Sequence, residues 1–363
     1  MNKTFISFLV LFTTLNTFSQ KYDFQIIKDI ETTPVTAQQK TGTCWSFSST
    51  SFLEAEIIRK TGASVDLSEM YTVRNIYMDK AENYVMRQGK AQFGEGGLNH
   101  DVINSVEKYG VTKQKEYSGK ADPNAPYDHS LMLAELEDIL KKVVEITPKK
   151  YPNWKADYNS ILDKHMGKIE DIKPMNKERL LQEYKINLND YITLTSFTHV
   201  PYHTKFILNI PDNFSNGYFH NITLDEFVQN IDNALDKGYT VALDCDVSES
   251  TFSSKTGIAV VPQNEADTAA IVTEIKPEKV ITAEFRQAEF ENYNTTDDHL
   301  MHIVGKARDQ KGNIYYKVKN SWGKESGKDG YMFMSVPYLR LKAISVMLHT
   351  EALITKTKKT FGF

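Results

Sequence analysis

The stretch QQKTGTCWSF at residues 38–47 decides the fold of this chain, because it holds Cys44, one of only two cysteines, at the start of a helical pattern. A thiol attacks a carbonyl carbon well only as a thiolate, and the free N–H groups of a helix N-terminus favour that anion. Gln38 can donate an amide N–H to an oxyanion. Apolar residues recur at helical spacing from residue 45 to 60, and Gly62 follows as a stop. The pattern therefore predicts a thiol that opens a buried helix, with a purely structural cysteine as the alternative.

Two apolar runs nearer the C-terminus predict an antiparallel hairpin that joins a histidine to an asparagine. HLMHIVG occupies residues 299–305, NIYYKVKNSWG occupies residues 313–323, and the turn sequence DQKG separates them. Cross-strand partners in a hairpin have nearly constant summed numbers, so His299 and Asn320 are expected to be neighbours. The carbonyl oxygen of an Asn can accept the second N–H of an imidazole and orient the ring. A thiol, a base and an orienting amide together are typical of thiol-dependent acyl transfer.

These motifs, in this order along the chain, resemble those of the papain-like cysteine proteases. The resemblance is carried by Q-x5-C-W-S-F, the Leu-Ser-Glu turn at 67–69, the Gly96-Gly97 pair, His299-x5-Gly305 and Asn320-Ser-Trp-Gly. The motifs are more similar to those of the bleomycin hydrolase and aminopeptidase C branch, because of Gln38-x-Lys40, Cys245-Asp-Val and Asp298-His-Leu-Met. The resemblance implies an α+β fold with two lobes: a helical lobe with the cysteine helix, an antiparallel β lobe with the histidine and asparagine, and a helical insertion.

The resemblance also assigns roles to individual residues. It implies that Cys44 is the nucleophile, that His299 is its base, that Asn320 orients the base, and that Gln38 helps to form the oxyanion hole. Binding of the substrate backbone falls to Gly96 and Gly97, where no side chain intervenes. Trp322 is expected to shield the contact between the histidine and the asparagine from water.

The implied activity is the removal of residues one at a time from peptide N-termini. The branch also implies a homohexamer and a C-terminal tail that lies in the cleft. The tail of this chain, residues 353–363, is basic and does not match such a tail, so its simplest interpretation is a solvated end. A papain-like endopeptidase and a non-catalytic peptide-binding protein of the same fold therefore stay open as alternatives.

The N-terminus has the pattern of a secretion signal. Lys3 supplies positive charge, residues 5–12 are mostly apolar, and Thr17 and Ser19 precede a cut before Gln20. We therefore expect a secreted or periplasmic protein. The expected division of the chain is a signal peptide at 1–19, a helical lobe at 20–120, a helical insertion at 121–235, a β lobe at 236–345 and a tail at 346–363.

Composition and charge limit the remaining function classes. The 363 residues include 43 basic and 47 acidic side chains, and the net charge of −4 gives no reason to expect a nucleic-acid partner. No segment after the signal is long and apolar enough to span a membrane. Peptides are the expected partners, and no cofactor is expected.

Neither a metal site nor a disulfide framework is expected. His299, His302 and Asp297 suggest a metal site at first sight, but residues three apart on a strand point to opposite faces. Two cysteines are too few for a disulfide framework, and both are expected to be free thiols. Cys245 fits a small buried strand residue better than a second catalytic or regulatory thiol.

Overall fold

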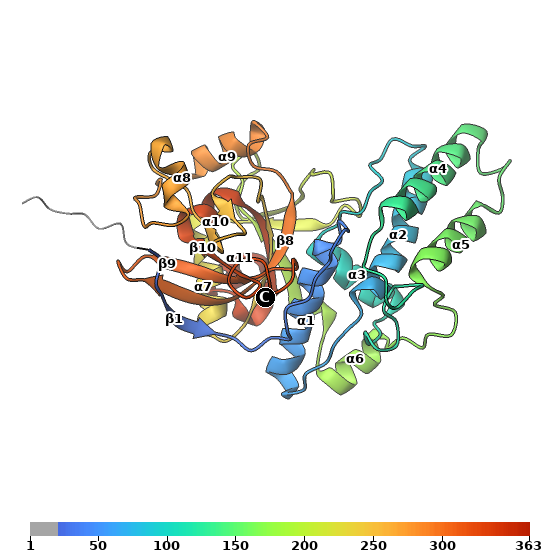
Figure 1. Ribbon diagram of the computed structural model, residues 1–363, viewed down its shortest axis with the longest axis horizontal. Helices are drawn as coiled ribbons and strands as arrows, with labels where there is room; N and C mark the ends of the chain where they lie inside the picture. Colours follow the sequence, from blue (N-terminus) through green and yellow to red (C-terminus); the bar gives the residue numbers. More distant parts are fainter. Residues whose placement is uncertain (1–20) are drawn as a thin grey trace, which may run out of the picture.

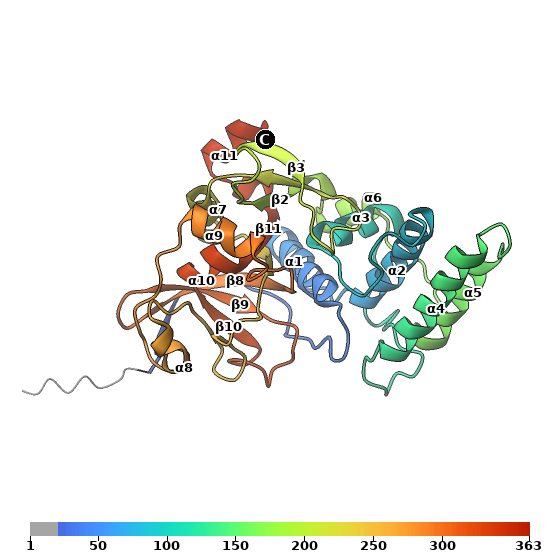
Figure 2. The same ribbon diagram turned by 90° about the horizontal axis from the view of Figure 1, so that it is seen from above.

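One long helix lies between a large β-sheet and a group of helices (Figure 1). The computed structural model describes residues 21–363, so the predicted signal peptide at 1–19 lies outside the described residues. The central helix is α1 (Cys44–Thr61), and the views in Figures 1 and 2 place it at the junction of the two parts. The mixed α+β fold expected from the sequence is confirmed.

Helix α1 begins at Cys44 and ends at the left-handed Gly62, as the sequence predicts. The helix is buried, as the sequence predicts, and every residue from Cys44 to Ile57 is buried. Small hydroxyl side chains allow this. Ser48 Oγ donates to the carbonyl oxygen of Met301 at 2.6 Å, and Ser46 Oγ donates to the carbonyl oxygen of Glu69 at 2.8 Å. Buried polar groups that find partners in this way let a helix pack on all sides.

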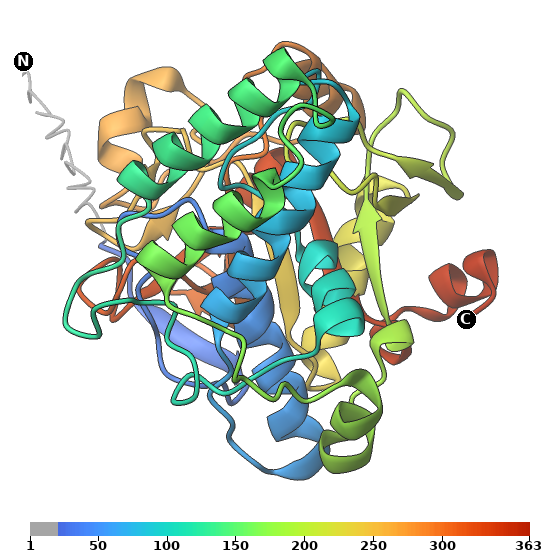
Figure 3. The ribbon, with the colours of Figure 1, turned by 90° about the vertical axis from the view of Figure 1, so that its right-hand side faces the viewer.

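A group of helices covers α1 on the side away from the sheet. The side chain of Ser68 caps the second helix, and Gly110 ends the third. Figure 3 shows the fourth and fifth helices side by side on the outer face of the second. The bounds of these helices are α2 (Glu69–Met86), α3 (Asn99–Tyr109), α4 (Ser130–Ile146), α5 (Trp154–Met166) and α6 (Lys177–Tyr184).

The prediction of a helical insertion throughout residues 121–235 is wrong in its second half. Helices end at Tyr184, and residues 191–221 contribute three strands to the sheet before helix α7 (Leu224–Asp236) begins. The run YITLT at 191–195 is buried at every position, because it lies within the sheet, and its β-branched residues suit that place. The new strands are β2 (Tyr191–Thr195), β3 (Thr204–Ile207) and β4 (Tyr218–Asn221).

Within residues 21–363 the sheet has eleven strands in the order β3-β4-β2-β11-β5-β8-β9-β10-β7-β6, with β1 also paired to β8. Pairing is antiparallel, as expected for the β lobe, except for the parallel pairs β2/β4 and β7/β10. The remaining strands are β1 (Phe24–Asp29), β5 (Val241–Cys245), β6 (Phe252–Ser253), β7 (Ile258–Ala259), β8 (His299–Asp309), β9 (Ile314–Lys319), β10 (Tyr331–Ser335) and β11 (Ala343–His349).

The two faces of the sheet have different covers. Leu300 and Ala242 face α1, whereas Met301 and Leu243 face the core formed with α7 and α10 (Val336–Lys342). Helices α8 (Thr268–Ile271) and α9 (Ala283–Glu291) complete this side of the molecule.

The C-terminal tail is folded rather than solvated. Its helix α11 (Thr355–Phe361) packs on α7, where Asn230 Nδ2 donates to Thr357 Oγ1 at 2.9 Å. The Phe361 ring lies edge-on to His220 of β4, with 4.7 Å between the ring centroids. These contacts place the tail on α7 and β4, so the position in the cleft implied by the resemblance is not the one observed.

Candidate active site

The first residue of α1 places Cys44 where α1 meets the sheet. The thiol is buried, with 7% of the residue exposed. Backbone hydrogen bonds from Leu300 on β8 and from Trp45 in the first turn of α1 lower its pKa. Because Leu300 directly follows His299, the sulfur of one element lies beside the strand that carries the imidazole.

His299 and Asn320 are hydrogen-bonded partners. His299 is the first residue of β8, Asn320 directly follows β9, and His299 Nε2 lies 2.8 Å from Asn320 Oδ1. The ladder pairs His302 with Lys319, so His299 and Asn320 are diagonal neighbours on one face. The hairpin predicted from the sequence is therefore present, and it brings these two side chains together.

Trp322 covers this pair. Its ring lies 4.7 Å from the His299 ring, centroid to centroid, at an interplanar angle of 33°. Trp322 is 37% exposed, whereas His299 is only 4% exposed, so the indole separates the imidazole from water.

Gln38 is fixed by the turn that carries Asn320. Its backbone N–H donates to the carbonyl oxygen of Ser321 at 2.9 Å, and its side-chain Oε1 accepts from Ser321 Oγ at 2.6 Å. Its Nε2 donates to the carbonyl oxygen of Thr41 at 2.6 Å. An amide nitrogen has two N–H donors, so one stays available for a ligand.

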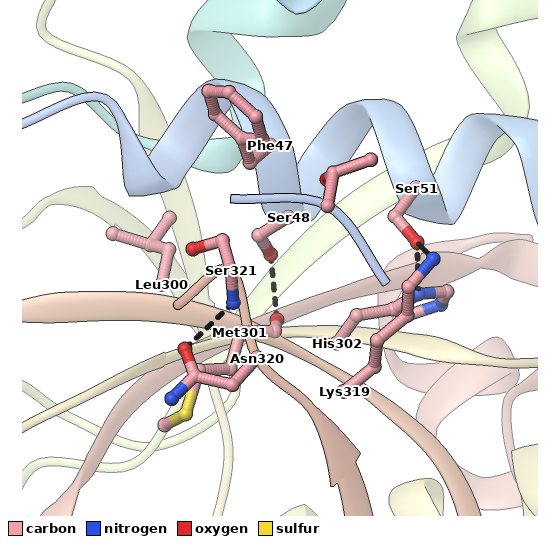
Figure 4. Close-up of a pocket in the computed structure, with 10 residues that line it drawn as sticks. Phe47, Ser48, Ser51, Leu300, Met301, His302, Lys319, Asn320 and Ser321 are labelled. Atoms are coloured by element: carbon pink, nitrogen blue, oxygen red, sulfur yellow. Dashed lines mark hydrogen bonds between the residues drawn. The ribbon is translucent and has the colours of Figure 1, made fainter. Parts of the chain in front are cut away.

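A small cavity with both polar and apolar lining lies behind these groups, between α1 and the hairpin (Figure 4). His302 points into it toward α1, where its Nδ1 lies 3.0 Å from Ser51 Oγ. Lys319 Nζ donates to the same hydroxyl at 2.7 Å and to the carbonyl oxygen of Thr33 at 2.7 Å. His302 is therefore a core histidine that bonds α1 through Ser51, whereas His299 bonds Asn320.

Burial dominates the electrostatics of the two reacting groups. It raises the pKa of Cys44 to about 12, against the lowering effect of the backbone N–H groups. It also lowers the pKa of His299 to about 4, which the bond to Asn320 only partly opposes. The resting site therefore holds a neutral thiol and a neutral imidazole, whereas the helix N-terminus alone suggests a thiolate. Burial destabilises the thiolate or the imidazolium when either is formed alone. Proton transfer from sulfur to nitrogen creates the two charges as a pair, so each stabilises the other.

The Gly96-Gly97 pair lies next to the cysteine helix. A Cβ atom on Gly97 would lie 3.0 Å from the Trp45 indole, and Trp45 Nε1 donates to the carbonyl oxygen of Glu95 at 2.8 Å. Only a residue without a side chain lets this backbone approach the indole so closely. The backbone of the pair is therefore adjacent to the first turn of the cysteine helix.

Sequence reasoning missed Asp212 and considered Asp297 only as a metal ligand, although both carboxyl groups lie near the thiol. Asp212 and Asp297 both raise the pKa of Cys44 through their charge, and the carboxyl group of Asp244 lies close to that of Asp297. Asp212 comes from the loop between β3 and β4, more than 100 residues from Gly96 in the sequence. No local pattern in the sequence points to this contact.

Both cysteines of the described chain are free thiols, as expected. Cys245 lies opposite His299 in the ladder between β5 and β8, and its Sγ donates to the carbonyl oxygen of Asp246 at 3.3 Å. Burial and neighbouring aspartates raise its pKa well above the usual value, so it has the properties of a buried strand residue. Among residues 21–363, no helix is long and apolar enough to cross a bilayer.

A thiol at a buried helix N-terminus, beside a strand whose histidine bonds an asparagine, defines the class of papain-like cysteine peptidases. The sequence pattern of the papain family cysteine proteases matches residues 18–183, which include Cys44. The pattern of the Peptidase C1-like family matches residues 112–362, which include His299 and Asn320. This second match covers more than half of the chain, so the protein belongs to the Peptidase C1-like family.

Individual relatives agree with this family. The chain is 23% identical to aminopeptidase G of Lactobacillus delbrueckii subsp. lactis, over 90% of this chain and 83% of the relative. It is 21% identical to aminopeptidase C of Lactococcus lactis subsp. lactis, over 90% and 82% respectively. The crystal structure of PepW from Lactobacillus rhamnosis superposes with a TM-score of 0.75 at 17% identity, covering 93% of this chain and 84% of that one. This superposition supports the papain-like fold.

Proposed function

We propose that this protein is a cysteine aminopeptidase, which hydrolyses the first peptide bond of a peptide substrate. The observation that carries the proposal is the bond of 2.8 Å between His299 and Asn320, beside a thiol at the start of α1. The relatives named aminopeptidase G and aminopeptidase C, each aligned over 90% of this chain, support the exopeptidase form.

In the proposed mechanism, Cys44 attacks the scissile carbonyl carbon while His299 takes the thiol proton. His299 then gives this proton to the leaving amine, and water hydrolyses the acyl-enzyme. Asn320 keeps the ring in position throughout. The backbone N–H of Cys44 and the free N–H of Gln38 stabilise the oxyanion, at about 3 kcal/mol per donor. In this proposal the edge of Gly96 and Gly97 binds the substrate backbone.

A pair of matched peptides tests the proposal. One peptide has a free N-terminal amine, and its twin carries an N-acetyl group. We expect the mature, reduced enzyme to cleave only the free-amine peptide, to lose this activity in the Cys44→Ala variant, and to be labelled at Cys44 by an epoxysuccinyl inhibitor. Equal cleavage of both twins would identify the endopeptidase instead. Absence of both labelling and cleavage would identify a non-catalytic peptide-binding protein.

For localisation we propose export, with removal of residues 1–19. The support is the charged and apolar N-terminal pattern of the sequence. N-terminal sequencing of protein recovered from the producing cells is expected to start at Gln20. A chain that starts at Met1 or Asn2 in the cytoplasmic fraction would refute export.

Homohexamer assembly is likewise a proposal, and it rests on the resemblance alone. Sedimentation velocity on the purified protein measures it directly. A particle of about 40 kDa, close to the chain mass of 41.5 kDa, would exclude the hexamer.

A further inference from the structure

The loop between β3 and β4, residues 208–217, lies over the Gly96-Gly97 edge. A Cβ atom on Gly96 would overlap the Asp212 carboxylate, so this carboxylate rests directly on the glycine. Asn213 holds the loop in shape, because its Nδ2 donates to the carbonyl oxygens of Leu208 at 2.9 Å and Gly217 at 3.1 Å. The loop therefore places an acid at the edge proposed to bind the substrate backbone.

The Asp212 carboxylate lacks a direct partner among the described residues. Burial raises its pKa, the charge of Lys80 lowers the pKa, and the charge of Asp101 raises it. Lys80 Nζ is itself occupied, because it donates to the carbonyl oxygen of Gly96. Asp212 is thus a partly buried acceptor with its own hydrogen-bonding capacity unused.

Two further carboxyl groups deepen this negative site. Both oxygens of Asp297 and Oδ1 of Asp244 are buried and have no hydrogen-bond partner of good geometry. The two carboxyl groups face each other, and burial together with the Asp212 charge raises the pKa of Asp297 to about 7. Asp297 is two residues before His299, and Asp244 is paired with Leu300 in the ladder. Buried acids this close repel one another, and a cation that enters among them relieves the repulsion.

We propose that Asp212, supported by Asp297, binds the α-ammonium group of the substrate, and that the 208–217 loop ends the groove one residue before the scissile bond. An ammonium group offers three N–H donors, which matches the unused carboxylate oxygens. A longer substrate would extend along Gly96, where Asp212 already lies. This inference rests on the proposed peptidase function and names the residues that make it an exopeptidase.

The test compares free-amine and N-acetylated aminoacyl-coumarin substrates across three variants. Asp212→Asn keeps the shape of the side chain and removes its charge, so we expect kcat/KM for free-amine substrates to fall at least 30-fold, with no fall for acetylated ones. Asp212→Glu is expected to keep part of the selectivity. Asp171→Asn, which neutralises an exposed acid, is the matched control and is expected to behave as wild type. Near-ultraviolet circular dichroism checks that each variant is folded.

The possible results separate this inference from the proposed function. If wild type is selective and Asp212→Asn keeps that selectivity, or loses both activities equally, the assignment of Asp212 is overturned while the peptidase stands. If wild type cleaves neither substrate, the proposed function fails, and calorimetry on the Cys44→Ala protein decides the inference. Leucinamide is then expected to bind at least tenfold more weakly after Asp212→Asn, and equal binding would overturn the assignment.

Discussion

At the scale of single residues, burial sets the resting state of the site. Cys44 and His299 are both neutral in the closed site, because neither charge is stable there alone. Their reaction therefore begins with transfer of a proton from sulfur to nitrogen, and the position of the imidazole controls that transfer. Asn320 fixes this position through a single hydrogen bond.

Replacing Asn320 with alanine tests that contribution. We expect Asn320→Ala to lower kcat for a free-amine peptide about 10-fold or more and to leave KM nearly unchanged, because one hydrogen bond that orients the base is lost. Steady-state kinetics measures this split. The exposed Asn189→Ala is the control, and a rise in KM alone would show that Asn320 acts in binding instead.

A second residue, Glu278, links protonation to stability. Its Oε2 accepts from the backbone N–H of Val261 at 2.8 Å and from Ser335 Oγ at 2.5 Å, and burial raises its pKa to about 7. The folded state therefore holds the proton more tightly than the unfolded state. This contribution to stability is fully present below the unfolded pKa of 4.5 and is lost as pH rises to about 7.

Glu278→Gln removes this titration while keeping an oxygen for both donors. We expect the variant to be more stable than wild type at pH 8, by on the order of 2 kcal/mol, and no more stable at pH 4. Urea unfolding at several pH values measures the difference. A constant difference at all pH values would show that the carboxyl group does not titrate in this range.

Residue-scale features were predictable from the sequence only where a local pattern carries them. Cys44, His299 and Asn320 lie in short motifs, and the expected register of the hairpin places the last two side by side. The neutral resting state was not predictable, because desolvation depends on everything packed around the thiol. Asp212 was missed for a similar reason, since its place on Gly96 exists only after distant segments meet.

At the scale of elements, the edge of the sheet depends on how closely β1 approaches β8. The two strands pair antiparallel, and Gly305 of β8 lies opposite Asp29, beside an irregularity in the register. A Cβ atom on Gly305 would overlap the carbonyl oxygen of Lys28. The glycine six residues after His299 therefore has a packing role: it lets the N-terminal strand join the sheet.

Gly305→Ala is accordingly expected to destabilise the protein by about 1–3 kcal/mol, because the added methyl group meets backbone that cannot rotate away. Thermal unfolding measures the loss. Gly94→Ala is the matched control, since a Cβ atom there meets nothing within 4 Å. Equal melting temperatures for both variants would mean that β1 can shift freely.

The strands at 191–221 show where element prediction from the sequence failed. The preceding segment to Tyr184 is helical and well charged, and the prediction wrongly continued this helical assignment into residues 191–221. Strand β2 is recognisable by its β-branched residues, but β3 and β4 are only four residues each. Such short strands are defined by their partners in the sheet, which the local sequence does not encode.

At the scale of the whole molecule, the tail adds to the fold without reaching the reacting groups. Helix α11 is bonded to α7 through Asn230, and Lys356 forms an ion pair with Glu226 at 2.6 Å. The closure of the groove is therefore proposed for the 208–217 loop, which is internal to the chain.

Deletion of residues 355–363 separates these two parts. We expect the truncated protein to lose about 1–3 kcal/mol of stability, because Asn230 loses its buried partner, Thr357, and apolar contacts are lost. The ratio of free-amine to N-acetyl cleavage is expected to stay at the wild-type value. A truncated protein that gains endopeptidase activity would show that the tail, and not the loop, limits the substrate.

Helix α1 is bonded to the helical part through Ser46 and to the sheet through Ser48. It is therefore a structural element common to both halves of the molecule. A rotation of one half relative to the other would break the hydrogen bond of Ser46 or that of Ser48. It would also move the sulfur of Cys44 away from the imidazole of His299. We therefore expect peptides to enter by local movement of surface segments, with the two halves locked together during turnover.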